Sequence, residues 1–270
     1  MKLLFENWRK YLTEGVNQET GEIEHKYYAF DWDDNLMRMP TSIYLEDEQG
    51  NEVEMSTADF AKYREKISKK EKFEYNRAII TGFAKNPFRG FRAEGDEKFK
   101  IDVMNAPTAD AWPKFVEAVN SGSYFAIITA RGHGRFAMFQ AIESLIEKNH
   151  EGLSKAALMD SLVEYEKSKQ VDSTLTPEEL LSMYYEKIMQ HIYPVSNDSV
   201  AAELGGGSAD SPEEAKVEAM RRFRDDMKIA NDDQLIKIGF SDDDYHNIET
   251  MAGAFSTDDV KLFYTGPERD

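Results

Sequence analysis

The chain has 270 residues, enough for one large domain or for a core domain with a substantial insert. It has no cysteine, which excludes disulfides, thiol nucleophiles and cysteine-bound zinc, and its five histidines form no metal-binding pair. No apolar run is long enough to span a bilayer, and the net charge of −18 disfavours a nucleic-acid backbone as a partner. We therefore expect a cytoplasmic protein that binds neither membranes nor long nucleic acids.

The first half of the chain begins with an amphipathic segment and then reaches a buried strand. An amphipathic helix is expected over residues 1–14, followed by a polar linker to residue 25. A strand over residues 27–30 ends at Asp31, and residues 42–56 resemble a hairpin with its turn at 49–51. A charged helix follows over 57–72, and Thr108 is expected to cap a helix that ends at Val119.

The second half of the chain alternates strands with helices. A strand that ends at Thr129 precedes a helix over about 136–148, and two more helices are expected within 154–191, the second with a capping box at 176–179. Strands are expected at 192–198, at 234–244 and near 260–266, with a helix from Ser211 to about Met227 between the first two. This alternation predicts an α/β protein with a mainly parallel sheet.

Three apolar strands end in residues that can do chemistry: Asp31 and Asp33, then Thr129, then Asp242 and Asp243. In an open α/β sheet, ligands bind beyond the carboxyl ends of the strands, so these ends are expected to meet at one crevice. Lys216, near the start of a helix that leads into the third strand, is expected to reach the same crevice.

These residue types fit phosphoryl transfer. A carboxylate that approaches a phosphate dianion needs a cation between them, and Mg²⁺ prefers oxygen ligands such as those of Asp31 and Asp242. Asp243 can hold a coordinated water, Thr129 can bind phosphate oxygens, and Asp33 can protonate the leaving oxygen and later activate water.

The order of these elements resembles the haloacid dehalogenase superfamily of phosphohydrolases. The resemblance rests on residues 31–36 (DWDDNL), the strand end at Thr129, Lys216, and residues 241–243 (SDD). It implies a Rossmann-like three-layer α/β/α core with a parallel sheet over residues 26–270, and cap insertions at about 37–106 and 150–190.

The same resemblance implies roles for the individual residues. Asp31 would be the nucleophile that forms an aspartyl-phosphate, and Asp33 the general acid and base. Thr129 and Lys216 would bind phosphate and steady the intermediate. Mg²⁺ would be held by Asp31, by the backbone carbonyl of Asp33, and by the carboxylates of Asp242 and Asp243. The substrate would be a phosphomonoester, either a small metabolite or a nucleotide, and the end of a polynucleotide stays open.

The chain departs from the family where Asp34 and Asn35 replace the frequent Gly-Thr pair, which adds a charge beside the site. Several residues also have plainer interpretations. Most lysines are solvated, so Lys228 and Lys237 rival Lys216 for the phosphate role. Asn247 is expected to be a polar residue on a helix face rather than a partner of the site, and His133 an ordinary loop histidine.

The sequence also allows two functions other than a phosphatase. One is a non-catalytic interaction protein that keeps the fold, associated with a phage virion; the intact Asp33 argues against it. The other is a phospho-accepting receiver domain, in which the acidic pair would precede the phosphorylated aspartate in a shorter chain.

The N-terminal segment carries a second resemblance. Residues 12–14 (LTE), before Gly15, are similar to the sites cut by the prohead proteases of tailed phages. That similarity implies a phage-encoded protein whose residues 1–14 direct it to the capsid, located in the host cytoplasm or the virion interior.

Overall fold

The computed structural model describes residues 25–168, 174–205, 211–231 and 236–267. The expected helix over residues 1–14 and the similarity to a protease site at residues 12–14 lie outside the described residues. Within the described ranges, no helix combines the length and the apolar character needed to cross a membrane.

The larger of two sheets is parallel and five-stranded, which confirms the predicted fold class. Its strands lie in the order β7-β6-β1-β8-β9. Their bounds are β1 (His25–Phe30), β6 (Phe125–Thr129), β7 (Ile192–Pro194), β8 (Ile236–Asp242) and β9 (Val260–Tyr264). The strand β1 is central, and its two neighbours β6 and β8 are the other two strands whose ends carry candidate residues. The sheet therefore places all three ends side by side.

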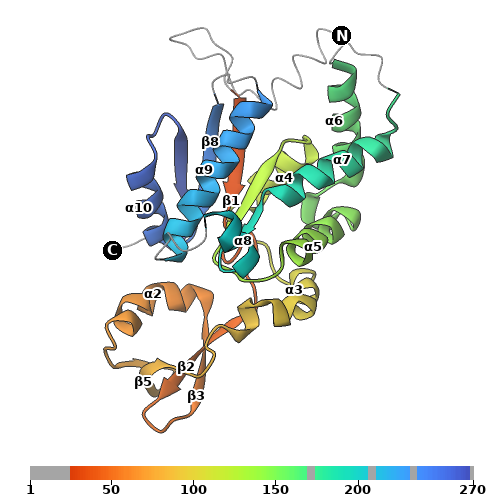
Figure 1. Cartoon of the computed structure of the whole chain (residues 1–270). Helices are drawn as coiled ribbons and strands as arrows, with labels where there is room; N and C mark the ends of the chain where they lie inside the picture. Colours follow the sequence, from red (N-terminus) through yellow and green to blue (C-terminus); the bar gives the residue numbers. More distant parts are fainter. Residues whose placement is uncertain (1–24, 169–173, 206–210, 232–235, 268–270) are drawn as a thin grey trace.

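Helices cover both faces of this sheet (Figure 1). One face packs against α3 (Asp96–Val103), α4 (Trp112–Asn120), α5 (Arg135–Glu147), α6 (Lys155–Ser168) and α7 (Pro177–Gln190). The other face packs against α8 (Asp198–Glu203), α9 (Pro212–Ala230) and α10 (Tyr245–Ala254). Side chains of a strand alternate between the two faces, so Phe30 of β1 enters the first core while Tyr27 and Ala29 enter the second.

Two helix starts test the capping predictions. Thr176 caps α7 in a complete capping box with Glu179, as its sequence predicts. The predicted cap at Thr108 is wrong: α4 begins at Trp112, and the Thr108 hydroxyl donates to the carboxylate of Glu151 at 2.6 Å. A hydroxyl can satisfy its hydrogen bond with any acceptor in reach, so a distant carboxylate can replace the local cap.

An antiparallel subdomain is inserted after β1, and we call residues 42–91 the cap. Its four strands lie in the order β3-β2-β5-β4. Their bounds are β2 (Ser42–Asp47), β3 (Glu52–Ser56), β4 (Phe73–Tyr75) and β5 (Ala78–Phe83), with α2 (Thr57–Ser68) between β3 and β4. The 3-10 turn η1 (Arg89–Phe91) ends the cap, and the 3-10 turns η2 (Ala93–Gly95) and η3 (His150–Gly152) lie outside it. The predicted hairpin is present, and Gly50 takes the positive φ of 80° that its turn requires.

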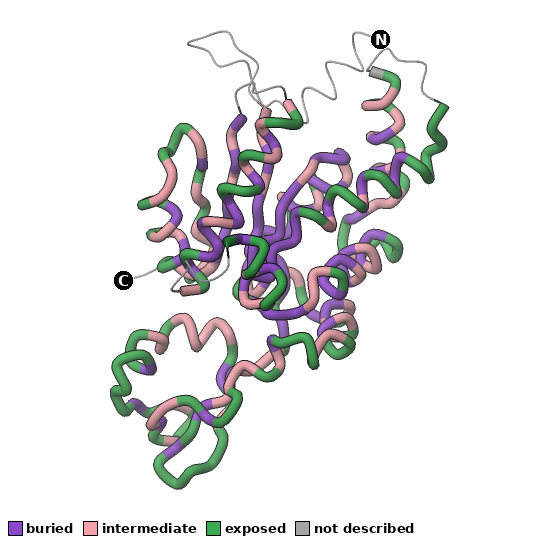
Figure 2. Tube along the Cα trace, viewed as in Figure 1, coloured by how far each residue is buried: buried purple, intermediate pink, exposed green. Residues whose placement is uncertain are grey.

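The cap has a small apolar core of its own, built from Ile43, Leu45, Met55, Ile67, Phe73, Ile80 and Phe91. Figure 2 shows that buried residues concentrate in the strands of the large sheet, whereas much of the cap is exposed or half-buried. In Figure 1, α2 lies on the side of the cap that faces the large sheet. The cap also makes polar contacts with the core, described below.

His191 makes the fold sensitive to acid. Its side chain is 3% exposed beside Phe223, and burial, with Lys187 and Arg135 nearby, lowers its pKa to about 4. Because the folded pKa is depressed, this group's stabilisation is present above pH 6.5 and is lost as the pH falls toward 4. Between pH 7 and pH 5 the loss amounts to about 2 kcal/mol.

We expect a His191→Phe variant to lose about 2 kcal/mol less unfolding free energy than the wild type between pH 7 and pH 5. Urea denaturation at both pH values measures this difference. His246→Phe, at an exposed histidine, is the matched control and should keep the wild-type slope. Equal slopes for His191→Phe and the wild type would contradict a buried neutral His191.

Candidate functional site

Neighbouring strand ends bring the acidic residues of the sequence motifs together. Phe30 of β1 is in register with Ser241 of β8, and the amide of Asp31 donates to the Ser241 carbonyl at 3.0 Å. One carboxylate oxygen from each of Asp31, Asp242 and Asp243 can be chosen so that all three lie within 4.8 Å of one another. This group, called the acidic triad below, has the spacing and donor type of a site for a divalent cation.

Two members of the acidic triad are buried, which is costly for carboxylates, and Asp243 is half-buried. Asp31 is 5% exposed and Asp242 is fully buried. Burial raises the pKa of Asp31 to about 8, partly offset by Lys216, and burial together with Asp31 and Asp242 raises the pKa of Asp243 to about 9. These carboxylates therefore favour a proton or a cation beside them.

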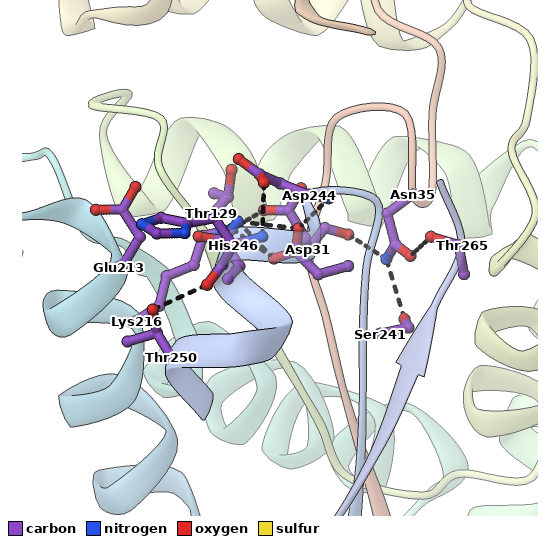
Figure 3. Close-up of polar contacts among 12 residues, drawn as sticks. Asp31, Asn35, Thr129, Glu213, Lys216, Ser241, Asp244, His246, Thr250 and Thr265 are labelled. Carbon is purple, nitrogen blue, oxygen red and sulfur yellow. Dashed lines mark hydrogen bonds and ion pairs between the residues drawn. The ribbon is translucent and has the colours of Figure 1, made fainter. Parts of the chain in front are cut away.

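Lys216 supplies one positive charge to the acidic triad. It lies in α9, whose first turn is capped by the Ser211 side chain. Its ammonium donates to Asp31 Oδ1 at 2.8 Å and to Asp242 Oδ2 at 2.7 Å. Burial alone would lower the pKa of Lys216, but the two aspartates outweigh burial and raise it. Lys216, rather than Lys228 or Lys237, is therefore the lysine that contacts the acidic triad. Figure 3 shows it reaching toward Asp31.

Asn247 of α10 fixes the orientation of Asp242. Its side-chain amide donates to both carboxylate oxygens of Asp242, at 2.9 and 3.0 Å, and the Asp244 amide donates to Oδ1 at 2.9 Å. The expectation that Asn247 is merely a polar residue on a helix face is wrong. Asp242 is the last residue of β8 and Asn247 lies in the first turn of α10, so only the packing of α10 on β8 brings the two side chains together.

Asp33 is held by an arginine that the sequence analysis did not single out. Arg131, 1% exposed and two residues after Thr129, donates from Nε to Asp33 Oδ2 at 2.8 Å and from Nη2 to Oδ1 at 2.5 Å. The guanidinium also lies near the rings of Phe91 and Phe99, at 4.8 and 5.0 Å from their centroids. A planar fork on a carboxylate is the strong, orienting form of ion pair. The available signal was the segment 129–132 (TARG) at a strand end.

His133 continues this contact toward the surface. Its Nε2 lies 3.0 Å from Arg131 Nη1, and its Nδ1 lies 2.9 Å from Asp96 Oδ1. A guanidinium only donates, so Nε2 must accept and Nδ1 must carry the proton that it donates to Asp96. Burial and then Arg131 lower the pKa of His133, which agrees with a neutral ring. His133 is thus a buried support for Arg131, contrary to the expectation of an ordinary loop residue.

Asp34 and Asn35, where the sequence departs from the family, shape the loop after β1. Asp34 takes a positive φ of 51°, a conformation that glycine adopts easily, and its carboxylate accepts from the Thr57 hydroxyl of the cap. Asn35 donates to the Asp31 carbonyl at 2.9 Å and to Ser241 Oγ at 3.1 Å, and accepts from Thr265 (Figure 3). Asn35 therefore ties the loop of β1 to β8.

Thr129 and the acidic triad open into a cavity of about 390 Å³ between the core and the cap. Thr129 is 1% exposed at the end of β6, and the amide of Arg131 lies 3.4 Å from its hydroxyl. Asp31, Asp33, Thr129, Lys216, Asp242 and Asp243 all line this cavity. The cavity therefore collects every residue predicted for the site. Asp33 lines it too, but its carboxylate is bound to Arg131 and does not belong to the acidic triad.

Arg64 connects the cap to the site, and the sequence analysis missed it. It lies on α2 and forms ion pairs with Glu213 of α9 and, at 3.0 Å, with Asp244 beside the acidic triad. Glu213 is 7% exposed in its side chain, so this contact is sheltered from solvent. Nothing in the local pattern of a charged helix distinguishes Arg64 from its exposed neighbours.

Comparison of the chain with models of known protein families, with curated protein sequences and with solved structures found no match.

Proposed function

We propose that this protein is a Mg²⁺-dependent phosphomonoester hydrolase that forms an aspartyl-phosphate on Asp31. The observation that carries the proposal is the largely buried acidic triad at the end of a parallel sheet: among the described residues, Lys216 alone forms ion pairs with its carboxylates. A cation offsets this excess of negative charge, and the cavity beyond it has room for a substrate.

The ligand set suits Mg²⁺. The acidic triad offers only oxygen donors, and the chain has no cysteine. Lys216 takes Oδ1 of Asp31 and leaves Oδ2 for a ligand role. Asp242 accepts four hydrogen bonds on its two oxygens, so it binds a metal directly only if Lys216 or Asn247 gives way. When bound, Mg²⁺ would neutralise phosphate charge and let a carboxylate approach phosphorus.

The residues of the chain support two successive displacements. In the first, an Asp31 oxygen attacks phosphorus, the bond from phosphorus to the leaving oxygen breaks, and Asp33 gives that oxygen a proton. In the second, Asp33 takes a proton from water, whose oxygen attacks phosphorus and releases inorganic phosphate and Asp31. Lys216 and Thr129 flank the phosphate position and stabilise its charge.

The contact with Arg131 bears on the proton-transfer role. Because a guanidinium only donates, Asp33 is held here with both oxygens as acceptors. To donate a proton to the leaving oxygen, Asp33 must first take up a proton from solvent and release at least one of these bonds. Arg131 thus keeps Asp33 ordered until a substrate competes for the contact.

The experiment that tests the proposal is metal removal and return. We expect the protein to hydrolyse p-nitrophenyl phosphate with Mg²⁺, to lose this activity in EDTA, and to regain it when Mg²⁺ is added in excess. Because the cation relieves repulsion within the acidic triad, Mg²⁺ should also raise the melting temperature.

The matched control is a pair of asparagine variants. Asp243→Asn removes one oxygen of the acidic triad and should weaken the rise in melting temperature, whereas Asp225→Asn, at an exposed position on α9, should leave it unchanged. Equal hydrolysis in EDTA and Mg²⁺, or no Mg²⁺ effect on melting in the wild type, would refute the metal requirement.

A further inference from the structure

Part of the wall of the cavity that contains the acidic triad is aromatic. It is contributed by the cap through Phe60 of α2, Phe83 of β5, Phe88 before η1 and Phe91 within η1. Phe60, Phe83 and Phe88 contact one another with ring centroids 5.4–6.1 Å apart, and we call these three the aromatic wall. One cavity is therefore lined both by the acidic triad with Lys216 and Thr129 and by an apolar, ring-bearing surface.

The sequence of α2 explains how the cap presents this surface. Thr57, Phe60, Ala61, Arg64 and Ser68 line the cavity at spacings of three and four residues, so they share one helical face. On that face, Arg64 pairs with Glu213 and Asp244 of the core. This ion pair holds the aromatic wall over the carboxyl ends of the large sheet.

Phe83 offers a ring for a ligand to cover. The residue is 43% exposed although it lines the same cavity as the acidic triad. A ring that is left exposed on the wall of a cavity gains stabilisation only when something apolar or planar covers it. The other two rings of the aromatic wall are half-buried and pack against it.

The aromatic wall selects among phosphomonoesters. A sugar phosphate needs hydroxyl partners, but this side of the cavity offers ring faces and edges. A planar heterocycle gains from stacking on such rings whatever its hydrogen-bonding edge. The cavity volume of about 390 Å³ falls in the range of small-ligand sites and accommodates a ligand with a phosphate at one end and a base at the other.

Resting on the proposed phosphatase function, we propose that the substrates are nucleoside monophosphates, with the phosphate at Asp31 and Lys216 and the base stacked on the aromatic wall. The aromatic wall then sets specificity and the acidic triad performs the reaction. The cap provides both the wall and, through Arg64, its placement.

The test compares two ligands that differ in the base alone. Adenosine monophosphate and ribose 5-phosphate share a sugar and a phosphate. Binding of each is measured by calorimetry with Mg²⁺ on the Asp31→Asn protein, which cannot form the phosphorylated intermediate. We expect adenosine monophosphate to bind about 10-fold tighter or more.

Variants then locate the difference. In the same background, Phe83→Ala should weaken adenosine monophosphate about 10-fold and leave ribose 5-phosphate unchanged. Phe136→Ala removes another exposed ring, on α5 and not in this cavity, and should change neither. Phe83→Leu keeps an apolar side chain and should still lose most of the discrimination, because the stacking face is gone.

The outcomes separate the two proposals. Equal affinity for the two ligands, or equal weakening of both by Phe83→Ala, would overturn the aromatic wall as a base site. Discrimination in binding with no hydrolysis by the wild type would leave the base site standing and refute the phosphatase. Hydrolysis of both ligands with equal kcat/KM would leave the phosphatase standing and refute the base site. Failure of both ligands to bind would overturn the base site.

Discussion

An Asp31→Asn variant is expected to lose about 10⁴-fold or more in kcat for phosphomonoester hydrolysis, because the amide cannot act as the nucleophile. The substitution keeps the shape of the side chain. It also removes a charge whose burial is unfavourable, since burial raises the pKa of Asp31 to about 8. The fold should therefore survive, with Lys216 still bonded to Asp242.

Two measurements make this prediction specific to nucleophilic attack. Acid quenching during turnover of a phosphorus-labelled substrate should trap a labelled wild-type protein and no labelled Asp31→Asn protein. Asp225→Asn, an exposed change of the same type on α9, should match the wild type in both assays. Hydrolysis by Asp31→Asn at the wild-type rate would show that another group attacks phosphorus.

A Lys216→Met variant is expected to lower the unfolding free energy in EDTA by about 3–5 kcal/mol, because it leaves buried carboxylates without their cation. Lys216 is 3% exposed in its side chain, and it bonds to Asp31 and Asp242 at 2.8 and 2.7 Å. Methionine has a similar length, so the main change is the lost charge and not a cavity. Urea denaturation measures the loss.

Mg²⁺ should restore part of this stability, since a cation in the acidic triad replaces some of the missing positive charge; a ligand at 100 times its Kd adds about 2.7 kcal/mol. Lys228→Met, later on the same helix, is the control and should change stability by no more than about 0.5 kcal/mol. Equal unfolding free energies for Lys216→Met and the wild type in EDTA would show that Lys216 does not stabilise the buried carboxylates of the folded protein.

Both variants probe a site that is assembled from separate elements with unequal roles. Asp31, Asp242 and Asp243 carry the negative charge, Lys216 offsets part of it, and Asn247 orients Asp242. Arg131 performs the corresponding task for Asp33. The positioning residues lie on different elements from the groups that they orient, as expected for a site on a rigid scaffold.

The amino-acid sequence by itself determined the parallel α/β class and the three strand ends. Runs of apolar residues that stop at Asp31, Thr129 and Asp242 are local signals, because strand burial and strand ends depend on neighbouring residues. The same holds for the capping residues Thr176 and Ser211, whose side chains bond to amides three residues away. Parallel strands with adjacent ends then bring these residues to one edge of the sheet.

Only the tertiary structure decided which side chains complete the site. The contact of Asp33 with Arg131 joins residues 98 positions apart, and that of Arg64 with Glu213 joins residues 149 apart. Periodicity tells which face of an element is buried, but it does not identify the element that packs across from that face. Arg64 and the aromatic wall of the cap therefore have no local signature, and their roles follow from how the cap lies over the large sheet. Arg131 has only its place just after a strand end as a local signal.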